Sequence, residues 1–139
     1  MTDKEIIESY ILKNYTFTSD SSGWRIFDNL GECVLTLKVL IRYMERVFPN
    51  MNTIKIVSDW FQLNITTVTD KIRTHLCKYK LVLGGRRLAW DIINGFGKSL
   101  DKNELYELYP QHHKTVIDYV YDQWFREMSE IETRKEIGC

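Results

Sequence analysis

The sequence has one alanine, Ala89, and only two prolines and three cysteines among its 139 residues. The cysteines, Cys33, Cys77 and Cys139, are odd in number and widely spaced, which argues against a disulfide framework and favours a reducing compartment. No run of 18 apolar residues occurs, so we expect no membrane-spanning helix and no membrane partner. No apolar signal segment follows the mixed charges of residues 1–5, so we expect a cytoplasmic protein, in a bacterial host if the source is viral.

Net charge is also lacking, because 19 basic residues balance 19 acidic ones. The balance is uneven along the chain: residues 62–90 hold six bases and one acid, between acidic flanks at 1–35 and 91–139. Such a block is typical of a local anion-binding surface, and a solvated face with chance clustering is the alternative. The shortage of alanine beside plentiful Ile, Lys, Tyr and Phe is typical of A/T-rich genomes, such as those of many phages.

Hydrophobic periodicity predicts a mainly helical α+β fold that forms a single domain over residues 1–139. Trp24, Trp60 and Trp124 lie on apolar stripes, so we expect them in the core. The expected elements, in chain order, are a helix over 3–13, a small N-terminal hairpin with strands at 15–18 and 24–27, a helix from 32 to 48 whose start at 34–37 is alternatively a strand, helices over 54–61 and 65–79, a basic hairpin with strands at 80–83 and 86–90 around Gly84-Gly85, and C-terminal helices within 100–135.

A central helix-turn-helix is predicted within residues 53–91. Its first helix needs a small residue where the two helices cross, and Ser58 takes that position. Gln62 stands where the turn commonly has glycine, and an ordinary helical hairpin is the alternative. Apolar anchors follow Ser58 at the usual offsets of +3, +5, +10 and +14: Phe61, Leu63, Val68 and Ile72.

Residues 64–73, followed by Gly84-Gly85 and Trp90, resemble a known module. They are similar to the small helix-turn-helix DNA-binding modules of phage homing endonucleases, in which a threonine- or serine-rich recognition helix precedes a Gly-Gly-x-x-x-x-Trp hairpin. The resemblance covers about residues 54–91. It implies DNA binding and no catalytic role for this segment.

In this interpretation the second helix enters the major groove of double-stranded DNA and the basic residues around it hold phosphates. The predicted base contacts are Thr66, Thr67, Thr69 and Arg73. The predicted phosphate contacts are Lys71, Lys78, Lys80, Arg86 and Arg87.

Sequence signatures of catalysis are missing. Residues 36–38 have threonine where a metal-dependent nuclease needs an acid, and residues 95–98 lack the spacing of a phosphate-binding loop. His112 and His113 are expected at a solvated helix start rather than on a metal. We therefore expect no enzyme, no catalytic residue, no metal, no cofactor and no small-molecule substrate.

The sequence favours a sequence-specific DNA-binding protein, a transcriptional repressor from a phage or mobile element. Such a protein would descend from the binding part of a homing endonuclease and lack its nuclease. The alternative is a small viral protein that binds and inhibits a host or competitor complex. The C-terminal helix is predicted either to form a homodimer or to complete the core, through Val116, Val120, Trp124, Met128 and Ile131.

Overall fold

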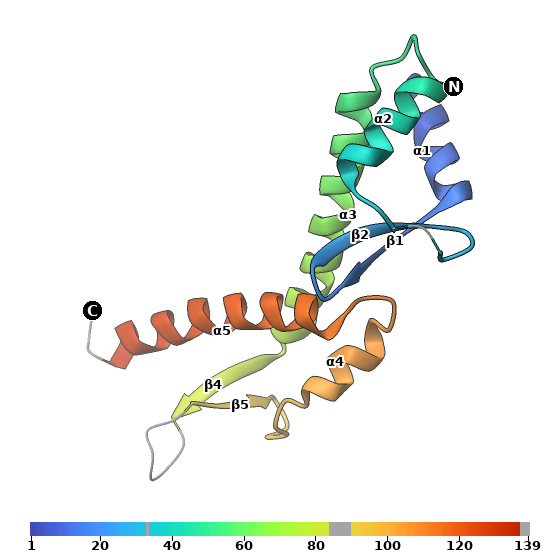
Figure 1. Ribbon diagram of the computed structural model, residues 1–139. Helices are drawn as coiled ribbons and strands as arrows, with labels where there is room; N and C mark the ends of the chain where they lie inside the picture. Colours follow the sequence, from blue (N-terminus) through green and yellow to red (C-terminus); the bar gives the residue numbers. More distant parts are fainter. Residues whose placement is uncertain (33, 84–89, 137–139) are drawn as a thin grey trace.

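The computed structural model describes residues 1–32, 34–83 and 90–136 of the chain. Among these residues it has the predicted mainly helical α+β architecture, with two small antiparallel sheets (Figure 1). Its elements are α1 (Asp3–Asn14), β1 (Tyr15–Asp20), β2 (Gly23–Asp28), β3 (Val34–Leu35), α2 (Leu37–Val47), α3 (Thr53–Leu76), β4 (Tyr79–Leu83), β5 (Trp90–Asn94), α4 (Lys102–Leu108) and α5 (Lys114–Glu136).

The N-terminal part packs α1, α2 and the first half of α3 with the sheet β1-β2-β3. Asp20 lies opposite Gly23, so Ser21 and Ser22 alone form the hairpin turn, which is tighter than predicted. The Asp20 carboxylate accepts a hydrogen bond of 2.8 Å from the amide of Ser22, which stabilises this turn. The buried apolar side chains of this N-terminal core are Ile7, Ile11, Ile26, Leu40, Met44, Val57 and Trp60.

Local capping decides where the first two helices begin. The Thr2 hydroxyl accepts a hydrogen bond from the amide of Glu5 at the start of α1. Thr36 caps α2 in the same way, so this helix begins after Val34–Leu35, which pairs with β2 as a strand. The alternative of a strand at this position is therefore confirmed.

The predicted helix-turn-helix is wrong, because residues 54–76 lie in one continuous helix of 24 residues, α3. The supposed turn lies inside this helix, and the Asn64 side-chain amide donates 2.8 Å back to the carbonyl of Trp60 instead of capping a new helix. The segment contains neither glycine nor proline, so nothing in it breaks the backbone ladder. The predicted second helix also ends earlier, at Leu76, and Tyr79 already belongs to β4.

The C-terminal part packs the second half of α3 with the β4–β5 hairpin, α4 and α5. Leu81 lies opposite Ile92, and both side chains pack into this core, which sets the register. The described partner strand is Trp90–Asn94, so strand structure continues past the predicted end at residue 90; residues 86–89 of the predicted strand and the Gly84-Gly85 turn lie outside the described residues. The buried apolar side chains of this C-terminal core are Ile72, Leu76, Tyr79, Leu81, Leu105, Ile117, Val120 and Trp124.

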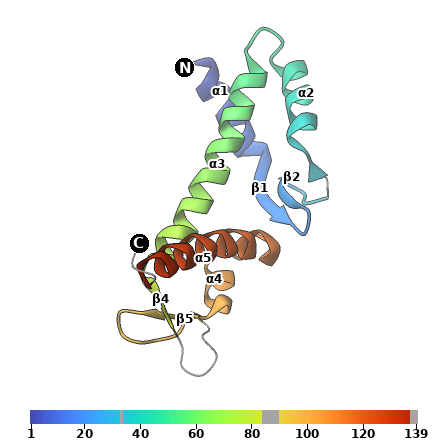
Figure 2. The ribbon, with the colours of Figure 1, turned by 90° about the vertical axis from the view of Figure 1, so that its left-hand side faces the viewer.

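The helix α3 connects the two cores, with its N-terminal half in one and its C-terminal half in the other (Figures 1 and 2). Figure 1 shows α5 crossing the lower end of α3 and passing beside the β1–β2 hairpin. In the part of the chain that the structure describes, no helix has both the length and the apolar character needed to cross a bilayer.

Candidate functional site

The three threonines predicted to read bases face different sides of α3. Thr66 lies in a hollow with Lys4 and Glu8 of α1, and Thr67 faces the end of α4. Thr69 points toward Trp24 and α5. The three side chains therefore line three separate hollows, and Thr69 lies on the side of α3 that faces α5.

Arg73, the fourth predicted base contact, is paired with Glu127 of α5. Its Nη1 lies 3.5 Å from one carboxylate oxygen, and its Nη2 binds the other. The hydrogen bond that Arg73 donates to Glu127 is the largest cause that raises the pKa of Arg73. The pair ties α3 to α5, so the Arg73 guanidinium is already occupied in the free protein.

The predicted phosphate contacts Lys71, Lys78 and Lys80 are all exposed. None of them forms an ion pair with a carboxylate of the described residues. Arg86 and Arg87 lie outside the described residues.

Two of these lysines line a groove of about 550 Å³ between the C-terminal end of α3 and the end of α4. We call it the lysine groove; its lining includes Thr67, Lys71, Thr74, Lys78, Leu108 and Tyr109. Thr67, Lys71 and Thr74 follow one another at intervals of four and three and form a single stripe on α3, and Lys78 lies in the turn directly after its end.

The lysine groove offers hydrogen-bond donors to an anion. The two ammonium groups outnumber the single carboxylate of the lining, Asp70. The Thr67 hydroxyl already donates 2.8 Å to the carbonyl of Leu63, so the donors of this groove are the lysines. Burial raises the pKa of Tyr109, which keeps this phenol protonated as a further donor.

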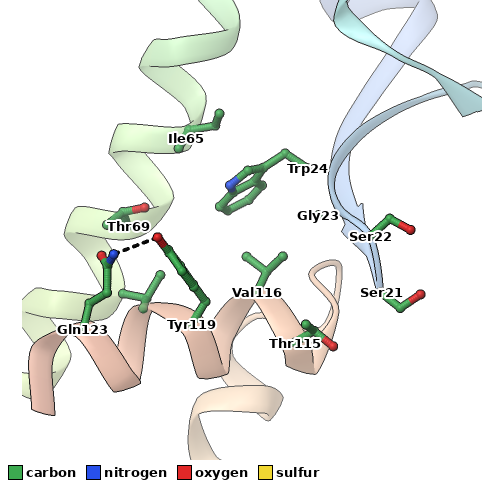
Figure 3. A pocket seen from close by; sticks show the side chains of 11 residues that line it. Ser21, Ser22, Gly23, Trp24, Ile65, Thr69, Thr115, Val116, Tyr119 and Gln123 are labelled. Carbon is green, nitrogen blue, oxygen red and sulfur yellow. Dashed lines mark hydrogen bonds between the residues drawn. The ribbon is translucent and has the colours of Figure 1, made fainter. Parts of the chain in front are cut away.

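A second hollow, the junction cavity, has a volume of about 460 Å³ and lies between the β1–β2 hairpin, α3 and α5 (Figure 3). The sequence interpretation did not find it. Its lining includes Trp24, Ile65, Thr69, Val116, Tyr119 and Gln123.

His112 lies behind the wall of this cavity and is buried, with an exposed fraction of 6%, so the prediction of a solvated residue is wrong for it. Its ring contacts Trp24 edge to face at 5.2 Å, and burial lowers its pKa. His113 is exposed, as predicted. Trp60 and Trp124 are in the cores as expected, whereas Trp24 is half-buried. The signal that could have pointed to Trp24 is its place directly after the polar turn residues Ser21 and Ser22.

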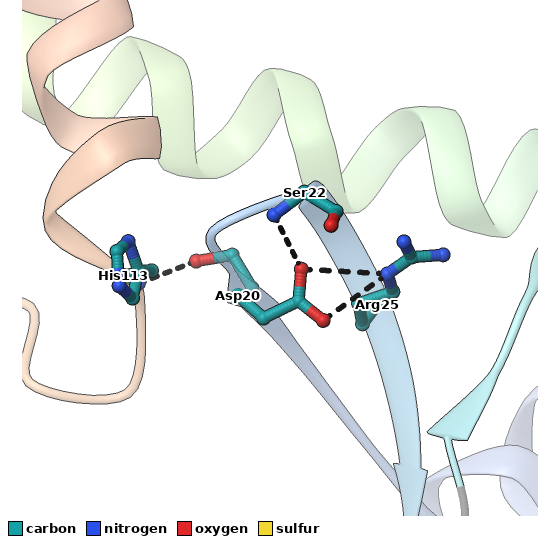
Figure 4. A network of polar contacts seen from close by, with 5 residues as sticks. Asp20, Ser22, Arg25 and His113 are labelled. Carbon is teal, nitrogen blue, oxygen red and sulfur yellow. Dashed lines mark hydrogen bonds and ion pairs between the residues drawn. The ribbon is translucent and has the colours of Figure 1, made fainter.

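Polar contacts hold the hairpin against the start of α5 beside this cavity (Figure 4). The amide of His113 donates 2.5 Å to the Ser19 hydroxyl. The hydrogen bond from the Ser22 amide, followed by the charge of Arg25, lowers the pKa of Asp20. These contacts fix one side of the junction.

The comparisons with known proteins give no family for this chain. No family model, curated protein or solved structure matches it. Across the described ranges, no three His, Cys, Asp or Glu side chains gather as a metal site requires. The candidate sites therefore stand on their geometry: a cationic groove at one end of α3 and a neutral cavity at its middle.

The predicted dimer helix contributes most of its stripe to the protein's own core. Val116, Val120 and Trp124 are buried, and Met128 packs against them. Only Ile131 of the stripe is largely exposed, at 43%. The homodimer stays a prediction, and the apolar stripe no longer provides its interface.

Proposed function

We propose that the protein binds double-stranded DNA through its phosphate backbone, with the lysine groove as the contact surface. The observation that carries this proposal is the set of exposed lysines, Lys71, Lys78 and Lys80, with no described carboxylate partner. Phosphate oxygens attract such ammonium groups, and the release of counterions from DNA supplies much of the affinity.

The continuous helix α3 changes how the DNA would be held. Base reading by the second helix of a helix-turn-helix is not part of the proposal, because no such helix exists. Thr67 and Thr74 lie on either side of Lys71 in the same stripe and are the side chains placed to meet base edges or sugars. A repressor of a phage or mobile element is the biological role that fits such binding.

The test is retention of labelled duplexes at about 150 mM salt, a condition where backbone contacts are already weakened. The triple variant Lys71→Ala, Lys78→Ala, Lys80→Ala should bind all duplexes more weakly and lower the salt slope by about 3, since each phosphate contact contributes roughly 0.9. The control is a matched triple variant in the N-terminal part: Lys4→Ala, Lys38→Ala and Lys55→Ala. It has the same net charge as the first triple variant and should bind DNA like the wild type. Equal losses in both triple variants, or no retention by the wild type, would contradict the proposal.

A second candidate is a protein-binding inhibitor, and the observation that favours it is Phe96. This ring is 97% exposed, on a loop after β5 that hydrogen bonds hold in place. The Asn94 side chain accepts from the amides of Phe96 and Lys98 at 2.9 and 3.0 Å, and Gly97 has a positive φ of 78°. A loop whose backbone is already held in place loses little backbone entropy on binding, which suits its exposed ring as an anchor in a partner's pocket.

The same DNA assay separates the two candidates. Under the DNA proposal, Phe96→Ser should retain duplexes like the wild type, because the loop lies outside the lysine groove. Isolation of one host protein by the wild type and not by Phe96→Ser, with no retention of duplex DNA, is the result that would favour inhibition.

A further inference from the structure

The junction cavity has the size and lining of a site for a small molecule. Its volume of about 460 Å³ falls inside the range of about 300–1,000 Å³ that is usual for ligand pockets. Its walls come from three elements that belong to both cores: the β1–β2 hairpin, α3 and α5 (Figure 3).

The charge of the lining narrows the class of ligand. None of the described residues that line the cavity carries a charged side chain. A charged ligand would lose its hydration there and find no counter-charge, which is costly in an apolar surrounding. The ligand that fits is therefore neutral.

The aromatic side chains of the lining indicate that the ligand has a flat ring. Figure 3 shows the Trp24 indole and the Tyr119 ring pointing into the cavity from the hairpin and from α5, with Val116 beside Tyr119 on α5. Phe17 stacks on the indole at 5.2 Å, and His112 meets its edge. The indole is thus held in place before any ligand arrives, and it offers a flat apolar surface for a ring.

Polar groups gather at the side of the cavity where α3 meets α5 (Figure 3). The Gln123 amide donates 2.8 Å to the Tyr119 hydroxyl there, and the Thr69 hydroxyl lies beside them. Val116, which belongs to the same lining, is buried and apolar. A ligand with an apolar ring and a hydrogen-bonding group at one end matches this distribution.

We propose that the junction cavity binds a neutral small molecule with an apolar ring and at least one hydrogen-bonding group. Such a ligand contacts the hairpin, α3 and α5 together and therefore holds the two cores in one arrangement. It binds the folded chain only, so it raises the melting temperature in proportion to the logarithm of its concentration.

The experiment titrates the full chain with Nile red, an uncharged aromatic dye whose fluorescence increases in an apolar site. We expect saturable binding of one dye per chain. Thr69→Phe fills the cavity from α3 and should weaken binding by about tenfold or more. Thr66→Phe places the same ring less than one turn earlier, outside this lining, and should bind like the wild type.

A second variant keeps the test independent of any folding defect in Thr69→Phe. The Tyr119 side chain is 63% exposed, so Tyr119→Ala leaves the core packing intact and removes one aromatic wall. It should also weaken dye binding and reduce the rise in melting temperature. The anionic dye 1-anilinonaphthalene-8-sulfonate should bind the wild type less tightly than Nile red does.

Three results would overturn the proposal. The first is the absence of saturable Nile red binding by the wild type. The second is an equal effect of Thr66→Phe and Thr69→Phe, which would place the dye elsewhere. The third is self-association that blocks the dye and disappears in Phe96→Ser, because the exposed ring of a second copy would then be the occupant.

Discussion

The buried hydroxyl of Ser19 accepts a hydrogen bond of 2.5 Å from the backbone N–H of His113, 94 residues further along the chain (Figure 4). The neighbouring Thr18 hydroxyl donates to the carbonyl of Gln111. Together these contacts attach the end of β1 to the segment that leads into α5. They are the polar part of the junction, whose apolar part is the contact of Phe17 and Trp24 with His112.

Ser19→Ala should lower the free energy of unfolding by about 1–3 kcal/mol, because the His113 amide loses its acceptor in a partly buried place. Urea unfolding followed by circular dichroism measures this loss. Ser22→Ala is the control: its side chain is exposed, and the change should stay within about 0.5 kcal/mol of the wild type. Equal stabilities for both variants would show that the Ser19 contact contributes nothing.

Gln62→Gly tests the continuity of α3. Gln62 is exposed in the middle of this helix, so glycine should destabilise the protein by about 0.5–1 kcal/mol relative to Gln62→Ala. A turn at the same position would give the reverse order, since glycine suits a turn that needs a positive φ. Denaturant midpoints of the two variants decide between the helix and the turn.

Trp124→Ala should be severely destabilising. The indole is 2% exposed in the C-terminal core, and truncation of such a side chain costs about 3–5 kcal/mol. Leu108→Ala, at a position that is 52% exposed, is the control and should have a small effect. The loss should not depend on protein concentration; a melting temperature that rises with concentration would instead show that Trp124 acts in a dimer.

Protonation of His112 should weaken folding below neutral pH. Burial lowers the pKa of this residue in the folded state below its ordinary value of about 6.5, so the unfolded chain binds the proton more readily. The titration of His112 therefore leaves the free energy of unfolding unchanged well above pH 6.5. It lowers the free energy of unfolding as the pH falls below 6.5. His112→Phe keeps a ring against Trp24 and should lose less stability between pH 7 and pH 5.5 than the wild type.

The control for this pH effect is His113→Gln, which leaves the buried ring of His112 in place. It should follow the wild-type change in stability over the same pH range. A His112→Phe variant with the full wild-type pH dependence would show that other groups cause it.

Much of the fold follows from local sequence signals. Thr2 and Asp101 stand directly before α1 and α4, and each caps its helix, so these starts could be predicted. The strand register of β4–β5 could not, because it depends on Leu81 and Ile92 entering a core made by α4 and α5. Register follows from such tertiary packing rather than from turn residues alone.

The helix-turn-helix prediction failed for a physical reason that can be read from its anchors. Phe61, Val68 and Ile72 are separated by seven and four residues, which is also the spacing of one face of a continuous helix. Leu63 is the anchor that breaks this spacing, and it is 58% exposed in α3. Two features of the sequence indicated one helix. Gln62 stands where the turn commonly has glycine, and Leu63 does not lie on the apolar face of the other anchors.

The candidate sites differ in how far the sequence led to them. Lys71 and Lys78 were found from charge alone, and the structure places both in the lining of one groove. The junction cavity could not be found, because Trp24 and Tyr119 are far apart in the sequence and meet only when the two cores are joined. The distance in space between two such residues depends on tertiary contacts, and a local sequence pattern does not predict it.

The division of the two cores along the chain bears on the order of folding during synthesis. The N-terminal core uses buried residues from Ile7 to Trp60 only, and the C-terminal core uses those from Ile72 to Trp124. The first core can therefore form on a nascent chain before the ribosome has made the second core. The chain leaves this first core through α3. The hydrogen bond from His113 to Ser19 and the walls of the junction cavity can form only after α5 begins to emerge. A pause in translation once residue 76 has left the ribosome, and before α5 has done so, would leave a structured intermediate without the cavity.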